Sequence, residues 1–129
     1  MSGDGSAYQP YYRTALDTVR AGAPNASCLV VSPLDQGTRD GDGKAKSKAS
    51  IQRMVTAQQQ VAHASGCAFW SAYDAMGGSG TIVRWMNMHP PLAWADLIHL
   101  SGAGLQVVGN LLSDAILQDY QDWLASGGA

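Results

Sequence analysis

The sequence has no excess of basic residues: 8 lysines and arginines stand against 10 acidic residues, for a formal net charge of -2. Without surplus positive charge, binding to a nucleic-acid backbone or to an anionic membrane surface is not expected. No apolar run approaches the ~20 residues that a membrane-spanning helix needs. Residues 1–10 are small and polar and lack the charged-then-apolar order of a secretory signal, so this segment assigns no compartment.

Patterns that bind metal are also missing. The histidines at His63, His89 and His99 do not have the spacing of a zinc site. The Asp-Gly run at 40–43 suggests calcium, but Ile51 stands where an EF-hand needs its glutamate. We therefore expect no metal and no cofactor. We expect His63 to lie on a helix surface and His89 on a loop.

Cysteine is scarce, with only Cys28 and Cys67 in the chain. Two cysteines are too few for a disulfide framework of the kind found in small secreted domains. Each cysteine opens a short apolar run, so we expect both to be small buried residues. A disulfide between two neighbouring strand starts is the alternative.

The chain does contain alternating helical and extended patterns, which are typical of an α/β fold with parallel strands. Apolar residues at helical spacing predict helices over about 7–21 and 48–65. The apolar runs 28–32 and 67–70 predict two parallel strands, which the second helix joins as a βαβ unit. The polar segment at about 34–50 is rich in glycine, aspartate and lysine, and is expected to be a mobile loop.

The C-terminal part has the clearest helix. Ser101 is a plausible N-cap, and a long apolar stripe follows it. The stripe consists of Leu105, Val108, Leu112, Ile116, Tyr120 and Trp123. Before it, the mixed stretch 71–95 contains a glycine cluster and a short helical piece near 82–88. Two strands are few for a parallel sheet, so we expect residues 1–129 to form a single but incomplete domain.

Asp96 and His99 are the strongest candidates for chemistry. They are three residues apart, immediately before the last helix. A carboxylate that accepts the Nδ1 proton of a histidine fixes its tautomer and stabilises the imidazolium, so that Nε2 can take a proton from a hydroxyl nucleophile. This spacing alone also arises by chance, as a loop aspartate beside a half-buried histidine.

Several blocks in a fixed order accompany this pair. They are 29–35, 66–78 with its Phe-Trp and Met-Gly-Gly sequences, Trp85, 96–101, and the helix glycines Gly104 and Gly109. Together these blocks resemble SGNH (GDSL-type) hydrolases over about residues 8–124. They are most similar to the bacterial branch that contains peptidoglycan and polysaccharide O-acetylesterases.

The resemblance implies the C-terminal part of a flavodoxin-like, three-layer α/β/α sandwich with a parallel sheet. It also implies hydrolysis of acyl esters, including O-acetylated sugars, by a bacterial and often extracytoplasmic enzyme. In the family, a serine near the first strand attacks the acyl carbonyl, and a glycine and an asparagine help to hold the oxyanion. The matching positions here are Asp96 for the orienting acid and His99 for the base.

Four further residues are weaker candidates for contact with substrate. Trp85 and Trp94 could stack on sugar rings, although packing in the core explains such residues equally well. Gly77 and Gly78 form the turn that the resembling family has between its Phe-Trp strand and the next tryptophan.

The nucleophile is absent from the part of the family pattern that this chain matches. Ser79 lies in a glycine run that departs from Gly-x-Ser-x-Gly, and Ser101 is better explained as a helix cap. We therefore expect a C-terminal half of an esterase that needs a serine-bearing N-terminal half. The alternative is a non-catalytic remnant that associates with copies of itself through its open strand edge.

Overall fold

The computed structural model describes residues 5–128. The helices are α1 (Gln9–Gly22), α2 (Ala49–Ala64), α3 (Ala72–Met76), α4 (Thr81–Met86) and α5 (Gly102–Ala125). The strands are β1 (Leu29–Val31), β2 (Gly37–Arg39), β3 (Ala45–Ser47) and β4 (Ala68–Trp70). The sequence predicted α1, α2, α4 and α5 near these positions from helical patterns, and β1 and β4 from short continuous apolar runs.

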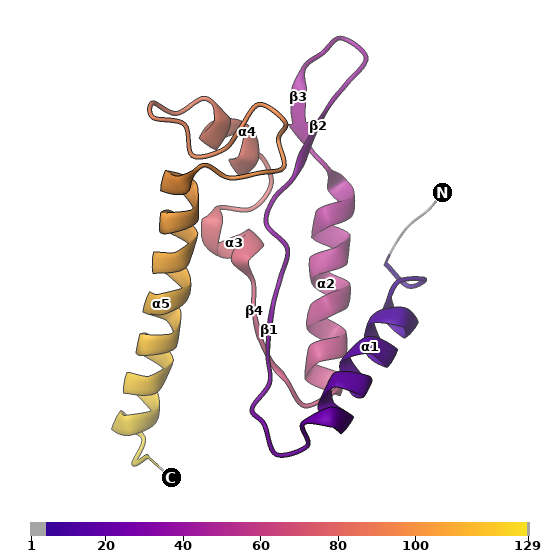
Figure 1. Cartoon of the computed structure of the whole chain (residues 1–129), viewed down its shortest axis with the longest axis vertical. Helices are drawn as coiled ribbons and strands as arrows, with labels where there is room; N and C mark the ends of the chain where they lie inside the picture. Colours follow the sequence, from indigo (N-terminus) through magenta and orange to yellow (C-terminus); the bar gives the residue numbers. More distant parts are fainter. Residues whose placement is uncertain (1–4, 129) are drawn as a thin grey trace.

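The centre of the fold is a parallel pair of strands. β1 pairs with β4 in a register that places Val30 opposite Phe69. α2 connects the two strands, as the crossover of a βαβ unit requires. α1 and α2 lie on one side of the pair and α5 lies on the other (Figure 1). The chain therefore has a mixed α/β fold with parallel strands and flanking helices, as predicted.

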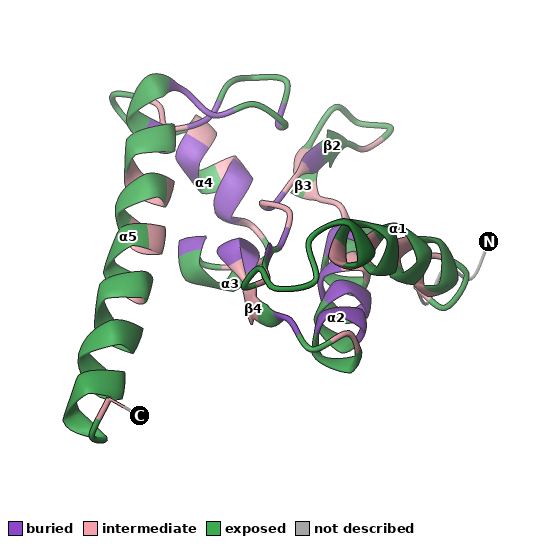
Figure 2. Cartoon of the chain, turned by 60° about the horizontal axis from the view of Figure 1, so that its bottom comes forward, coloured by how far each residue is buried: buried purple, intermediate pink, exposed green. Residues whose placement is uncertain are grey.

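Buried side chains form separate clusters on the two sides of the strands. One cluster fills the space between α3, α4 and the segment that precedes α5, and includes Ile82, Trp85 and Leu97. The clusters beneath α2 include Val30 and Ala62. Figure 2 shows the same division, with buried residues concentrated in α2, α3 and α4 and little burial along α5.

Cys28 and Cys67 form a disulfide, so the expectation of two separate buried thiols was wrong. Both cysteines immediately precede a strand, Cys28 before β1 and Cys67 before β4. Because parallel strands in register begin at the same end of the sheet, the two cysteines are brought together, and their Cα atoms are 4.8 Å apart. The alternative considered from the sequence, a bridge between neighbouring strand starts, is the arrangement found.

The segment expected as a loop at 34–50 contains a β-hairpin. β2 and β3 pair antiparallel, with Thr38 opposite Lys46. At the tip, the Asp40 carboxylate accepts hydrogen bonds from the amides of Asp42 (3.0 Å) and Lys44 (2.9 Å). The composition suggested a loop because the strands are short and polar, whereas the Asp40 turn and main-chain pairing stabilise a hairpin.

Helix α5 begins as predicted and remains largely uncovered. The Ser101 hydroxyl accepts a hydrogen bond from the Gly104 amide (3.1 Å), so Ser101 is the N-cap. The predicted apolar stripe is helical, but much of it faces solvent. Its exposed members include Leu105, Ile116, Tyr120 and Trp123. Gly104 is the only buried residue of α5, so packing holds this helix mainly at its first turns.

Two glycines of α5 provide a matched test of this attachment. A Cβ on Gly104 would overlap the Leu92 carbonyl group, whereas a Cβ on Gly109 would meet nothing within 4 Å. We expect Gly104→Ala to lower the free energy of unfolding by about 2 kcal/mol, as overpacking does. Gly109→Ala should raise it by about 0.5–1 kcal/mol, because alanine is the better helix former. Urea unfolding followed by circular dichroism measures both changes, and a loss of equal size in both variants would contradict the described contact.

Candidate functional site

Asp96 and His99 lie in contact in a tight turn before α5. The Asp96 Oδ2 atom is 2.7 Å from His99 Nδ1. The other carboxylate oxygen, Oδ1, accepts hydrogen bonds from the amides of Ile98 (2.9 Å) and His99 (3.0 Å). Because both oxygens are engaged, the carboxylate has a fixed orientation toward the imidazole ring.

Leu97 lets the chain make this turn. Its φ angle is +60°, in the left-handed region that branched residues rarely occupy. The side chain is 1% exposed and packs in the cluster with Ile82 and Trp85. Burial of a leucine side chain is worth about 2 kcal/mol, which is comparable to the cost of about 1–3 kcal/mol for such a backbone conformation. The side chain thus points into the core while Asp96 and His99 on either side remain at the surface.

The electrostatics of the turn keep Asp96 ionised. Hydrogen bonds from the His99 amide, the His99 side chain and the Ile98 amide lower the pKa of the Asp96 carboxyl from 3.8 to about 2. These donors stabilise the charged form, which a carboxylate needs in order to accept the Nδ1 proton. The arrangement can therefore hold a histidine with Nδ1 protonated and Nε2 available as a base.

The Nε2 edge of the His99 ring is open. Its side chain is 75% exposed, and among residues 5–128 no hydrogen-bond partner of Nε2 is found. Ser101 is not a nucleophile for it, because the Ser101 hydroxyl donates to the Pro91 carbonyl (2.7 Å) and caps α5. Ser79 lies exposed in the glycine turn. No hydrogen bond joins either serine to His99 in the described part of the chain.

The weaker candidates are divided between the core and the surface. Trp85 is 8% exposed and packs in the core, so the suggestion that it stacks on a sugar is not retained. Trp94 is 52% exposed, and its amide donates to the His99 carbonyl (2.9 Å), which keeps it on the same turn as the Asp-His pair. Gly77 and Gly78 form the turn after α3, with φ angles of 124° and 69°. A Cβ on Gly77 would lie 2.8 Å from Thr81 Oγ1, so close packing against α4 explains this glycine.

The other two histidines lie outside this turn. His63 is exposed near the end of α2, where its ring makes an edge contact with Phe69. His89 is exposed on the loop after α4. No group of three or more metal-ligating side chains occurs among residues 5–128. Over the same range, no helix has the length and apolar character to cross a bilayer.

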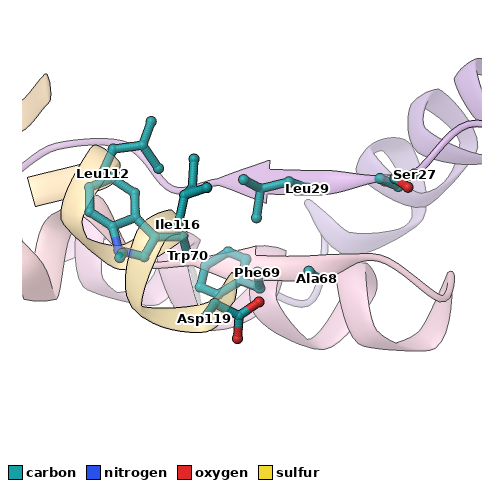
Figure 3. Close-up of a pocket in the computed structure, with 10 residues that line it drawn as sticks. Ser27, Leu29, Ala68, Phe69, Trp70, Leu112, Ile116 and Asp119 are labelled. Carbon is teal, nitrogen blue, oxygen red and sulfur yellow. The ribbon is translucent and has the colours of Figure 1, made fainter. Parts of the chain in front are cut away.

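A second feature, an apolar cavity, lies away from the Asp-His pair. It has a volume of about 440 Å³ and is bounded by the start of β1, by β4 and by the middle of α5. Leu29, Trp70 and Ile116 contribute to its wall, and Asp119 lies at its edge (Figure 3). Neither Asp96 nor His99 lines it. The cavity therefore belongs to the incompletely covered sheet and not to the candidate site.

Sequence reasoning gave no role to Gly37, whose amide donates to the Leu97 carbonyl at 2.7 Å. The two residues are far apart in the sequence and lie in a hairpin and a turn. No local pattern relates such positions, and only covariation between homologous sequences could have indicated the contact.

Comparison with known proteins shows what this arrangement is similar to. No protein-family model matches the sequence, and no curated protein matches it. A solved structure of a peptidoglycan O-acetylesterase superposes with a TM-score of 0.78 at 21% sequence identity, covering 91% of this chain and 33% of that one. The esterase domain of the ORF1 protein from the zebrafish ZfL2-1 retrotransposon superposes with a TM-score of 0.56 at 16% identity, covering 92% of this chain and 61% of that one. The chain thus spans about a third of the first structure, and over that span the two have the same fold.

Proposed function

We propose that this chain supplies the Asp96–His99 pair of a serine-dependent ester hydrolase. The observation that carries the proposal is the 2.7 Å contact between Asp96 Oδ2 and His99 Nδ1, with Oδ1 fixed by two backbone amides. This is the geometry by which a carboxylate orients a catalytic histidine. The esterase fold of the superposed structures supports the same reaction class.

In the proposed acylation step, His99 acts first as a base and then as an acid. A serine hydroxyl from another segment attacks the ester carbonyl carbon, and its proton passes to His99 Nε2 as the new C–O bond forms. Asp96 stabilises the imidazolium that results. The tetrahedral intermediate then loses the alcohol, which takes the proton from His99, and the acyl group remains on the serine.

Deacylation repeats these transfers with water. Water attacks the acyl-serine carbonyl and gives a proton to His99 Nε2. The C–O bond to serine breaks, the serine oxygen takes the proton back from His99, and the carboxylic acid leaves. Every step that involves His99 uses Nε2, which is the exposed nitrogen.

The serine and the oxyanion donors are proposed to come from an N-terminal half of the same fold. Within residues 5–128, β1 pairs only with β4, which leaves its other edge open, and Leu29 and Val31 on it are exposed. Open strand edges pair readily with a further strand. The chain covers 33% of the superposed O-acetylesterase, so a segment carrying the remaining strands would extend the sheet from β1.

The proposed substrate is an acyl ester, with O-acetylated sugars as the first class to examine. The superposed peptidoglycan O-acetylesterase supports this choice, and the exposed Trp94 ring on the same turn as His99 offers a face for a sugar. The Cys28–Cys67 disulfide supports an oxidising compartment, because such bonds persist outside the reducing cytosol.

Reconstitution tests the proposal. The 129-residue chain is assayed with p-nitrophenyl acetate alone, and again after co-expression with the polypeptide encoded immediately upstream or with the N-terminal two thirds of an O-acetylesterase. We expect ester hydrolysis above the buffer rate only from the combined polypeptides, since the oxyanion hole and the nucleophile must both be present.

Two outcomes would contradict the proposal. Turnover by the chain alone would mean that it contains a nucleophile, and Ser79 would be the next residue to change. A stable complex with no esterase activity would favour a non-catalytic remnant. Sedimentation of the chain alone then distinguishes a monomer from a self-associating module.

A further inference from the structure

The β2–β3 hairpin contacts the Asp-His turn on both sides of Asp96. The Gly37 amide donates to the Leu97 carbonyl at 2.7 Å. The Arg39 guanidinium, through Nη2, donates to the Ala95 carbonyl at 3.4 Å. Strand β2 therefore holds the main chain immediately before and immediately after Asp96.

The contact at Gly37 leaves no room for a side chain. A Cβ there would lie 2.9 Å from the Leu97 Cβ atom, 3.0 Å from the Lys46 carbonyl oxygen and 3.2 Å from the Ile82 Cγ2 atom. Gly37 does not have a positive φ angle, so the turn chemistry of the hairpin does not demand glycine. Close approach of β2 to the turn is what requires it.

Buried hydrogen bonds fix the base of the hairpin. The Asp35 side chain is fully buried, and its Oδ2 atom accepts from the Ser47 hydroxyl (2.6 Å) and from the Ile82 amide (3.0 Å). The Ser47 hydroxyl in turn accepts from the Gly80 amide at 2.7 Å. A shift of the hairpin would break these bonds inside the protein, where unpaired polar groups are costly. The hairpin is thus a fixed support.

We propose that Gly37 and Arg39 are positioning residues for the Asp96–His99 pair. The left-handed conformation at Leu97 is unfavourable by itself, and the hydrogen bond from Gly37 to its carbonyl helps to hold it. The structural part of this inference concerns the chain alone, whereas its consequence for catalysis rests on the proposed function.

Gly37→Ala in the full chain tests the inference by NMR. We expect the Ile98 and His99 amide proton resonances to move upfield, because their hydrogen bonds to Asp96 Oδ1 lengthen. The carboxyl of Asp96 should titrate closer to 3.8 than to about 2. Gly41→Ala is the matched control, since a Cβ on Gly41, in the same hairpin, meets nothing within 4 Å. That variant should leave both readouts unchanged.

Arg39→Gln is a second variant, which carries the test if Gly37→Ala does not fold. Arg39 is exposed, and its loss removes the hydrogen bond to Ala95 without crowding the core. We expect the same resonances to move in the same direction by a smaller amount. Lys44→Gln, which removes a charge near the tip of the same hairpin, is the control.

The outcomes separate this inference from the proposed function. The positioning role would be overturned if the Ile98 and His99 amide resonances stayed unchanged in a folded Gly37→Ala variant. If Gly37→Ala does not fold, unchanged resonances in Arg39→Gln would overturn it in the same way. If the resonances move, the reconstituted esterase should lose up to about 100-fold in kcat with little change in KM, as for a misplaced catalytic group. Moved resonances with full esterase activity would support the positioning contact and overturn the catalytic role of the pair.

Discussion

In a reconstituted esterase, Asp96→Asn is expected to lower kcat for p-nitrophenyl acetate by roughly 10⁴-fold. Asparagine has nearly the same shape, but its amide can donate a hydrogen bond to Nδ1. His99 would then be held with its proton on Nε2, and Nε2 could no longer accept the serine proton. The loss should appear in kcat and not in KM, because the interaction with His99 matters most in the charged transition state.

Two comparisons make this result specific. Asp42→Asn changes an exposed aspartate at the hairpin tip and should leave kcat unaltered. His99→Ala should abolish activity to a similar extent, and the double variant should lose no more than either single variant, because residues that act as a unit are not additive. Full activity in Asp96→Asn would show that the 2.7 Å contact with His99 has no catalytic role.

Loss of the Cys28–Cys67 disulfide is expected to lower the free energy of unfolding by roughly 4 kcal/mol. The bond joins residues separated by 39 positions in the sequence, and closing a loop of this length removes much of the entropy of the unfolded chain. The comparison is between urea unfolding of the native chain and of a variant with both cysteines changed to serine.

Dithiothreitol supplies the control for this second experiment. Reduction should bring the native chain to the stability of the serine variant and should not affect the serine variant itself. Equal stability of the oxidised and reduced chains would show that the bond does not constrain the unfolded state. The starts of β1 and β4 would then be held together by the main-chain pairing of the two strands and by α2 alone.

The elements that the sequence predicted are those with one strong local signal. α2 and α5 have apolar residues at helical spacing, β1 and β4 have short apolar runs, and Ser101 precedes α5 as a cap. The hairpin at 34–50 was missed because its strands are polar and its support is the buried Asp35, whose partners come from distant segments. The disulfide was only the alternative prediction, after two separate buried thiols, because the register between β1 and β4 cannot be derived from composition.

The candidate site shows the same division. The spacing of Asp96 and His99 allowed an orienting pair, and the structure places them in contact; their catalytic role remains a proposal. The sequence could not indicate the left-handed Leu97 or the amide of Gly37 that supports it, because both depend on packing between segments remote in the chain. It also could not distinguish Trp85 from Trp94, since burial depends on the final arrangement of α4 and the turn.

The uncovered stripe of α5 has a consequence for the handling of this polypeptide in a cell. An unassembled copy displays Ile116, Tyr120 and Trp123 on a helix whose only buried residue is Gly104, near its start. Chaperones and proteases act on polypeptides that expose such surface. If a serine-bearing half covers it, copies made in excess of that half would be degraded, and the two polypeptides would accumulate in equal numbers whatever their rates of synthesis.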